Sequence, residues 1–473
     1  MYLPYPTSPD FMANMFEKTV QAAGAALELE PDCLDALNSR ASSLVILGKY
    51  NDAGSDYSKI LEIDSDHDMI GVFSGVVKVL KAKEDSIPNG WAKLLDVMTP
   101  LISFYEQKLP TLDEGNTQMR QIRMALMVRL KTMHFAMFAY HESKSGDNEL
   151  AWHHLTLASR YKMAVLPPYN AAREDQNIAV IKSILVHGFW PTRSGVGSTS
   201  EKNIVIVGFP RSGSTLLERI LDAHPQIVGT GEDSVFNGIL GEVRDGIIQA
   251  SATGSLVSVV QAFANRIDSI TRERWAELER NSNGEESSSI EPRYFVDKML
   301  SNYKNIGFIH MLYPDALILH IAREPMDTVF SSFKHEFPPG KLDYTSDMES
   351  LAHMYRNYRE IMDHWDEHLP GRVTHIRYED IVHDKTGMSK SIIAATGLDW
   401  DDDILNFHKK KQAVNTHSTT QVRKGIYNDS LQTWKRHESH LQPLVHFLGK
   451  SNTKHKFETS LPGYHITGQS EYD

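Results

Sequence analysis

The stretch Asn203–His224 reads NIVIVGFPRSGSTLLERILDAH, and it decides the fold of the second half of the chain. The apolar, β-branched run Ile204–Val207 predicts a buried strand, and Gly208 and Gly213 predict a tight loop after it. The apolar residues of Leu216–Leu221 recur with a helical period, so a helix follows at once. A strand, a loop and a helix N-terminus in this order favour a bound phosphate, because backbone N–H groups and the helix dipole attract an anion.

This loop departs from the common nucleotide-binding pattern at one position. The spacing from Gly208 to Thr215 matches G-x-x-x-x-G-K-[ST], but Ser214 stands where the lysine belongs, and Arg211 is the only cation in the loop. The missing lysine is the one that reaches the β- and γ-phosphates in nucleoside triphosphatases. The loop therefore predicts nucleotide binding without hydrolysis of ATP or GTP.

The composition limits the class of protein. The 473 residues, 41% hydrophobic and 23% charged, suffice for two or three folded domains. A net charge of −12 argues against a general nucleic-acid binder. The single cysteine, Cys33, excludes an intramolecular disulfide, and together with an N-terminus that lacks an apolar leader it favours a cytoplasmic location. The apolar run Met69–Leu80 contains Lys78 and is too short to span a bilayer, so we expect no transmembrane segment.

Residues 13–190 have helical patterns with few strand signals, and we expect an all-α domain there. In a 34-residue unit ending near Ser65, small and aromatic residues fall where a tetratricopeptide repeat interlocks two antiparallel helices. These residues are Ala41, Gly48, Tyr50, Ala53, Tyr57 and Ile60. A weaker match lies at His134–Met163. The alternative is a set of plain helical hairpins with alanines at close contacts. The adjacent His153 and His154 lack further ligands at a recognisable spacing, so we expect no metal site.

A Gly/Ser-rich polar stretch at 193–203 predicts a domain boundary. From 203 to Tyr427, short β-branched runs alternate with helical patterns, which predicts a P-loop-like domain over 203–450 built on a parallel sheet. Residues 281–292 read as a polar insertion, and the tail after about Lys450 reads as polar and loose.

Charged or aromatic residues follow the strands expected in this domain. These strands and the residues after them are Ile204–Val207 before Arg211, Tyr294–Val296 before Asp297 and Lys298, Ala316–Ala322 before Arg323, and Val373–Ile376 before Arg377 and Tyr378. The carboxyl ends of parallel strands share one edge of the sheet, where ligands bind. The ligand should therefore carry phosphate groups at more than one place. Arg323 and the nearby Ser331 suit a second phosphate, although Arg323 could instead pair with Glu324 or Glu379.

Six segments in this order resemble the motifs of sulfotransferases: GFPRSGSTLLERIL, GTGEDS, VDKM, HIAREPMDTVFSSF, IRYEDIV and STTQVRKGIYNDSLQTW. Over about residues 30–450, the chain is similar to the tetratricopeptide-repeat sulfotransferase family, which is related to the protein-tyrosine sulfotransferases. The resemblance implies 3′-phosphoadenylyl sulfate (PAPS) as the donor co-substrate. Its 5′-phosphosulfate and 3′-phosphate account for two anion sites. No metal is implied, since lysine and arginine supply the positive charge.

The resemblance also assigns roles in donor binding. The 5′-phosphosulfate would be held by Arg211, Ser212, Gly213, Ser214 and Thr215, and the 3′-phosphate by Arg323 and Ser331. Tyr378 would lie against the adenosine diphosphate portion of the donor. A later segment with Gln421, Val422, Arg423 and Lys424 would cover the donor. Thr433 departs from the pattern, because tyrosine sulfotransferases have a donor-binding lysine there; Lys435 or Arg436 could substitute.

Three residues would carry the chemistry implied by the resemblance. Glu232, in GTGEDS, matches the general base that removes the acceptor proton. Lys298 would stabilise charge on the departing phosphate, and Ser418 would orient the sulfonate. Asp233 and His224 are rivals for the base, and Glu232 could instead cap the next helix.

Two other functions remain open at this stage. A P-loop nucleotide or sugar kinase would share the fold, and a non-catalytic helical-repeat scaffold would explain the first domain. The acceptor is open as well: a peptide tyrosine, a glycan, a lipid or a small alcohol all suit the same donor machinery. The repeats could present a concave surface to a protein or glycan partner.

Overall fold

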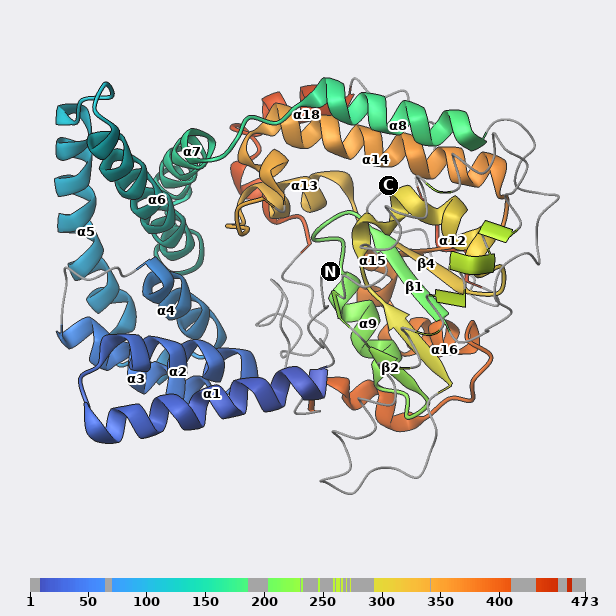
Figure 1. Cartoon of the computed structure of the whole chain (residues 1–473), viewed down its shortest axis with the longest axis horizontal. Coiled ribbons are helices and arrows are strands. Elements are labelled where there is room, and N and C mark those ends of the chain that lie inside the picture. Colours follow the sequence, from blue (N-terminus) through green and yellow to red (C-terminus); the bar gives the residue numbers. More distant parts are fainter. Residues whose placement is uncertain are drawn as a thin grey trace.

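An all-helical part precedes an α/β part in the chain (Figure 1). The structure is a computed structural model that describes residues 9–63, 70–185, 203–229, 231–232, 293–340, 342–409, 431–449 and 457–461, with isolated positions between 246 and 273. A parallel sheet after a helical region is the fold class expected from the sequence, and that prediction is confirmed. Among the helices that the structure describes, none is both long enough and apolar enough to cross a membrane.

The helices before the sheet are α1 (Pro9–Leu29), α2 (Leu34–Leu47), α3 (Tyr50–Ile63), α4 (Ile70–Ala82), α5 (Gly90–Lys108), α6 (Thr117–Tyr140), α7 (Asn148–Val165) and α8 (Ala171–Leu185), with short turns η1 (Glu84–Ser86), η2 (Leu109–Thr111) and η3 (His141–Ser145). Side chains cap the N-termini of some of these helices. Asn116 Oδ1 accepts hydrogen bonds from two backbone N–H groups at the start of α6, and Asp147 does the same for one N–H of α7.

The unit expected to be a tetratricopeptide repeat forms the neighbouring helices α2 and α3 (Figure 1). Gly48 ends α2 in the left-handed region (φ 76°), which glycine adopts without steric cost. Ala41 and Ala53 are fully buried, and Tyr57 packs beside them in the core of the helical part. The small residues thus lie at close helix contacts, while the assignment to the tetratricopeptide class stays a prediction.

Helices α6 and α7 and the turn η3 between them bring three histidines together. His134 Nδ1 lies 2.9 Å from His154 Nδ1, His141 stacks on His154, and His134 Nε2 lies 3.3 Å from Glu106 Oε1. Burial, reinforced by the neighbouring His154 and His153, lowers the pKa of His134 to about 3. Burial also lowers the pKa of His154 to about 4.

These histidines make stability depend on pH. The folded state holds His134 neutral, whereas the unfolded chain protonates it below its ordinary value of 6.5. Its contribution to stability is therefore present above pH 6.5 and falls as the pH drops toward 3, by about 2 kcal/mol at pH 5. We expect urea unfolding to show a smaller free energy at pH 5 than at pH 7.5. His134→Gln should shrink that difference; an equal pH dependence in the variant would contradict this account.

Two helices of the first part also belong to the core of the α/β part. Phe138 of α6 and Leu155 of α7 join the same apolar cluster as the strand residues Val205 and Ile318. Lys334 Nζ of the α/β part lies 2.6 Å from Glu142 Oε1, and Lys131 Nζ lies 2.9 Å from Glu336 Oε1 across the same contact. The two parts therefore share a continuous packed interface.

Helix α8 lies with the α/β part, although the helical domain was expected to extend to 190. It runs beside α14 in Figure 1. Ile178 and Ile181 of α8 pack into the core of the α/β part, and Asn357 Nδ2 of α14 donates to Asp175 Oδ1 at 3.0 Å. Most of the expected linker, 193–203, and the expected insertion, 281–292, lie outside the described residues.

The sheet has five parallel strands in the order β2-β3-β1-β4-β5. They are β1 (Asn203–Gly208), β2 (Ile227–Gly229), β3 (Tyr294–Asp297), β4 (Leu317–Ala322) and β5 (Val373–Arg377). The elements around them are α9 (Ser214–Asp222), η4 (Leu300–Asn305), α12 (Ile306–Leu312), α13 (Pro325–Phe333), η5 (Asp343–Ser346), α14 (Met348–His368), α15 (Tyr378–His383), α16 (Lys385–Ala394), η6 (Asp402–Lys409), η7 (Thr433–His437) and α18 (Gln442–Gly449). The four strands expected from the sequence are present, and β2 was not expected.

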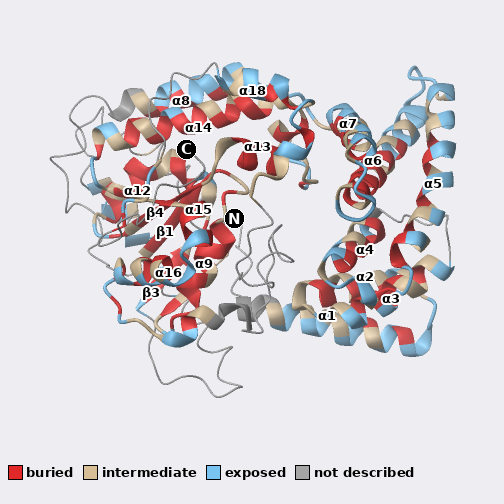
Figure 2. Ribbon diagram, turned by 180° about the vertical axis from the view of Figure 1, so that it is seen from behind, coloured by how far each residue is buried: buried red, intermediate tan, exposed pale blue. Residues whose placement is uncertain are grey.

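Helices cover both faces of the sheet, and the strands are correspondingly buried (Figure 2). Along β1, Val205 and Val207 belong to the cluster that includes α12, α13 and α14, whereas Ile204 and Ile206 belong to the cluster that includes α9 and α16. This burial on both sides explains why the strand reads as one apolar run. Since β1 is central and the strand order reverses beside it, the loop after β1 lies at a ligand-binding switch point.

The tail after Lys450 was expected to be loose, and this is wrong for residues 457–461. Ser460 N donates to His375 O at 2.9 Å, and His375 N donates to Ser460 Oγ at 2.8 Å. Leu461 is buried in the core beneath β5. These contacts hold the segment against β5, an edge strand whose backbone groups would otherwise face solvent.

Candidate functional site

The loop between β1 and α9, which we call the phosphate-binding turn after its expected ligand, has a strained backbone. Arg211 adopts φ 70°, a left-handed conformation that is uncommon for a residue with a side chain. Gly213 adopts φ 104° and precedes the first turn of α9. Ser212, Ser214 and Thr215 are buried, and Ser212 Oγ has no hydrogen-bond partner among the described residues. A buried donor left open beside a helix N-terminus suits an anionic ligand.

Arg211 and Arg323 lie in one place, although they are 112 residues apart. Arg323 Nη1 donates to Arg211 O at 3.3 Å, and Arg211 Nε donates to Ser331 Oγ at 3.1 Å. The parallel register explains this proximity, since β4 pairs directly with β1 and its carboxyl end delivers Arg323 to the loop after β1. The two cations expected at separate anion sites thus share one edge of the sheet.

Tyr378 completes this group from the start of α15. Its ring lies against Gly213, where a Cβ atom would clash with Tyr378 Cδ2. The guanidinium carbon of Arg323 lies 4.7 Å from the centroid of the Tyr378 ring, a cation–π distance. An aromatic face, two arginines and a serine therefore meet around the phosphate-binding turn.

The fit of Tyr378 against the loop makes Gly213→Ala costly. The new methyl group would need both a strained positive φ and a shift of the tyrosine ring, so we expect a loss of about 2–3 kcal/mol of stability. Gly371→Ala is the matched control, because Gly371 also has a positive φ (74°) but no atom within 4 Å of the position of a Cβ. Chemical unfolding compares the two. Equal destabilisation would show that Tyr378 does not confine the loop.

Acidic residues lie around Arg323, and its positive charge acts on Glu379, one of the two partners expected from the sequence. Arg323 Nη2 lies 4.0 Å from Asp327 Oδ2, in the first turn of α13. Glu379 Oε1 accepts a hydrogen bond from Glu324 N at 2.9 Å. Burial raises the pKa of Glu324, of Glu379 and of Asp327. Arg323 is thus held in a buried, partly acidic setting at the end of its strand.

Asp327 also fixes the chain that follows residue 430. Gln432 N donates to Asp327 Oδ2 at 2.8 Å, and Gln432 adopts φ 55°. Thr433 and Lys435 lie in η7, directly after this contact. Thr433, which stands where the tyrosine sulfotransferases have a lysine, directly follows this contact. The hydrogen bond to Asp327 thus joins the segment to α13, the helix that contains Ser331.

A second cluster lies at the ends of β2 and β3. Lys298 is fully buried, and its Nζ lies 3.1 Å from Glu218 Oε2 and 3.5 Å from Glu232 Oε1. Glu232 is 43% exposed at its side chain, so it faces solvent, whereas Glu218 is buried. A cation and an accessible carboxylate next to the phosphate-binding turn are the groups that acid–base transfer chemistry needs.

Both ring nitrogens of His224, an alternative candidate for the base, make structural contacts. Its Nδ1 accepts a hydrogen bond from Gln226 N at 3.1 Å, and its Nε2 lies 3.1 Å from Asp399 O. The ring is buried at the end of α9. Asp233, Ser418, Gln421, Val422, Arg423 and Lys424 lie outside the described residues, so their expected roles stay predictions.

Sequence reasoning missed Glu218. The sequence of α9 has an amphipathic pattern, which places Glu218 and Asp222 on a polar face expected to be exposed to solvent. Instead, α9 is covered on both sides, and these two carboxylates accept hydrogen bonds from Gly231 N at 2.9 Å and Gly229 N at 2.7 Å. Their spacing of four residues on one helix face, opposite a glycine-bearing loop, is the signal that could have identified them.

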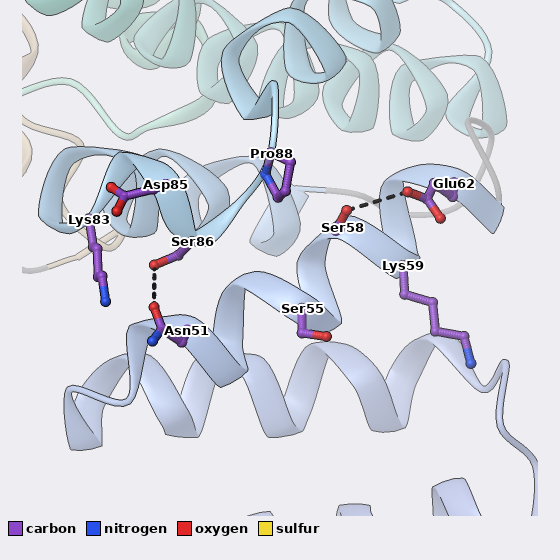
Figure 3. Close-up of a pocket in the computed structure, with 9 residues that line it drawn as sticks. All are labelled: Asn51, Ser55, Ser58, Lys59, Glu62, Lys83, Asp85, Ser86 and Pro88. Carbon is purple, nitrogen blue, oxygen red and sulfur yellow. Dashed lines mark hydrogen bonds between the residues drawn. The ribbon is translucent and has the colours of Figure 1, made fainter.

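No group of three or more His, Cys, Asp or Glu side chains in the described part of the chain could hold a metal ion. A polar hollow of about 700 Å³ lies in the helical part, between α3 and η1 (Figure 3). Its lining groups bond to one another: Ser86 Oγ donates to Asn51 Oδ1 at 3.0 Å, and Ser58 Oγ donates to Glu62 Oε1 at 3.4 Å. None of its lining residues belongs to the groups around β1.

Comparison with known proteins assigns a family to the α/β part. Residues 203–402 match the model of the Sulfotransferase family. An uncharacterized protein of Aquifex aeolicus (strain VF5) is 28% identical over 257 residues, covering 54% of this chain and 33% of that protein. Protein-tyrosine sulfotransferase 1 of Danio rerio is 24% identical over 252 residues, covering 49% of this chain and 65% of that protein. The chain therefore spans a third of the first relative and just under two thirds of the second.

Among solved structures, the sulfotransferase domain from the curacin biosynthetic pathway is 16% identical, with a TM-score of 0.31, and it covers 52% of this chain and 98% of that chain. The sulfotransferase domain of the Synechococcus PCC 7002 olefin synthase is 18% identical, with a TM-score of 0.29, over 51% of this chain and 96% of that chain.

Proposed function

Because residues 203–402 form a sulfotransferase-family domain related to the protein-tyrosine sulfotransferases, we propose that the chain transfers a sulfuryl group from PAPS to a hydroxyl acceptor. One observation carries the choice of donor. Arg323 Nη1 donates to Arg211 O while Arg211 Nε donates to Ser331 Oγ, so two anion-binding groups converge beside one turn. A nucleotide with phosphates at both its 5′ and 3′ positions matches that pair of groups.

Different groups bind the two phosphate ends of the donor. The backbone N–H groups of the loop 211–215 and the start of α9 hold the 5′-phosphosulfate, as at other helix N-termini. Arg323 and Ser331 hold the 3′-phosphate. Tyr378 lies against the adenosine diphosphate portion, where its ring already packs on Gly213. Ser418, Gln421, Val422, Arg423 and Lys424 contribute from the later part of the chain.

Transfer proceeds by in-line attack. The acceptor oxygen forms a bond to sulfur as the bond between sulfur and the bridging oxygen of the 5′-phosphate breaks, and adenosine 3′,5′-bisphosphate leaves. Glu232 takes the proton of the acceptor hydroxyl. Lys298, 3.5 Å from Glu232, stabilises the charge that develops on the leaving oxygen. No metal takes part, because lysine and arginine side chains supply the positive charge.

The acceptor carries a hydroxyl group, and peptide tyrosines, glycans and small alcohols fit this chemistry. The helical part offers a further surface for an acceptor, since α7 packs on η5 and η7, the turns that flank α13, and the ring of Trp152 of α7 lies 6.3 Å from that of Phe333 of α13. A protein or glycan bound there would extend over both parts of the chain. Such a partner is part of the proposal.

The experiment is donor turnover. Purified protein is incubated with PAPS and, in parallel reactions, with 4-nitrophenol, a tyrosine-containing peptide and an oligosaccharide, and adenosine 3′,5′-bisphosphate is quantified by chromatography. We expect acceptor-dependent release of this nucleotide, without added metal. No turnover in any reaction, together with phosphorylation of an acceptor from MgATP, would replace the proposal by a P-loop kinase.

A further inference from the structure

Glu218 is a buried carboxylate inside the helix that begins at the phosphate-binding turn. Its side chain is 8% exposed, and it comes one turn after the loop in α9. A buried carboxylate is costly unless ion pairs and hydrogen bonds compensate for lost hydration. The ion pair and the hydrogen bond that Glu218 forms therefore indicate its role.

The first partner is Lys298. Glu218 Oε2 lies 3.1 Å from Lys298 Nζ, and the lysine side chain is fully buried. Glu232 lies further from the same nitrogen, at 3.5 Å, and is largely accessible. Glu218 is thus the closer and better shielded counter-charge of Lys298, and a long, flexible side chain held at its tip has few other positions.

The second partner is the loop that carries Glu232. Glu218 Oε1 accepts a hydrogen bond from Gly231 N at 2.9 Å. Gly231 O in turn accepts one from Lys298 N at 3.3 Å. Gly231 adopts φ 73°, so the chain turns sharply just before Glu232. One carboxylate therefore joins the backbone next to the expected base and the ammonium group of the expected charge-stabilising lysine.

We propose that Glu218 is a positioning residue for sulfuryl transfer, which sets the distance between the Lys298 ammonium group and the Glu232 carboxylate while touching neither donor nor acceptor. This inference rests on the proposed function. Because α9 starts at the phosphate-binding turn, Glu218 also fixes both groups relative to the donor. Both oxygens of its carboxylate are used, one for the loop and one for the lysine.

Asp222 offers a matched control on the same helix. It accepts a hydrogen bond from Gly229 N at 2.7 Å and lies 3.5 Å from Arg219, so it holds the same loop. Neither of these two contacts involves Lys298 or Glu232. Asp222→Asn keeps an acceptor for Gly229 N and should change kcat less than about threefold.

The test uses Glu218→Gln, which keeps an oxygen for Gly231 N but removes the charge facing Lys298. We expect kcat for sulfuryl transfer to fall by roughly 10²-fold, because the ammonium group is no longer held where charge develops. The dissociation constant for adenosine 3′,5′-bisphosphate should change less than about threefold, since the donor contacts are intact. Glu218→Asp keeps the charge and should recover part of the lost kcat, which a purely steric role would not produce.

A double-mutant cycle with Lys298→Met decides whether Glu218 acts through the lysine. In the Lys298→Met background, Glu218→Gln should lower kcat no further. The double variant replaces the whole buried pair by neutral groups, so it remains measurable even if one single variant folds poorly. Unchanged kcat in Glu218→Gln, or an equal fall in both backgrounds, would overturn the inference while wild-type turnover leaves the proposed function standing. Absence of wild-type turnover with PAPS would overturn both.

Discussion

Glu232→Gln is expected to lose sulfuryl transfer by about 10²–10⁴-fold, the usual range for removing a general base. The amide has nearly the shape of the carboxylate but cannot accept the acceptor proton. The side chain is accessible and 3.5 Å from Lys298, so the substitution removes chemistry at the surface of the site rather than core packing. Donor binding depends on other residues and should persist.

The measurement pairs kcat with the affinity for adenosine 3′,5′-bisphosphate. A large fall in kcat with an unchanged dissociation constant supports the role of base. Asp233→Asn is the neighbouring control, and it should retain most of the activity. If Glu232→Gln were fully active and Asp233→Asn inactive, the role would move to Asp233.

Arg323→Ala is expected to weaken binding of adenosine 3′,5′-bisphosphate by roughly 10²–10³-fold, because it removes the buried cation that we propose binds the 3′-phosphate. The Arg323 side chain is 8% exposed, and water cannot readily replace it. Thermal unfolding must accompany calorimetry, since Asp327 loses a nearby positive charge. Arg323→Lys keeps that charge and should bind with intermediate affinity, because lysine cannot form the paired bonds of a guanidinium group.

Arg377→Ala is the control for a general charge effect. Arg377 is the last residue of β5, but its Nε lies 3.9 Å from Glu379 Oε2, and no donor contact is assigned to it. We expect its affinity for the nucleotide to stay within about threefold of the wild type. Equal losses in Arg323→Ala and Arg377→Ala would indicate that overall positive charge, and not a 3′-phosphate site, governs binding.

The arrangement of residues at the edge of the sheet could be predicted because it follows strong local signals. A β-branched run, two glycines and an apolar helical period identified β1, the loop and α9 directly. The parallel arrangement then predicted that Arg211 and Arg323 would meet, although they are far apart in sequence. The structure brings them within hydrogen-bonding distance, while their roles toward a nucleotide stay proposals.

Other features depend on tertiary contacts that no local pattern encodes. Strand β2 has three residues, Ile227–Gly229, too few for an alternating pattern, and it forms only because β3 offers an edge. Glu218 looks like a surface residue until α9 is covered on both sides. Segment 457–461 lies in a largely polar tail, yet Ser460 pairs with His375 of β5 and Leu461 is buried. In each case, the partner that decides the conformation lies elsewhere in the chain.

The most direct measurement is calorimetry of the wild-type protein with adenosine 3′,5′-bisphosphate and with adenosine 5′-monophosphate. If Arg323 and the loop after β1 hold opposite phosphates of one nucleotide, the 3′-phosphate should tighten binding by at least about 10²-fold. Arg323→Ala should remove most of that difference. Equal affinities for the two nucleotides in the wild type would contradict the central claim.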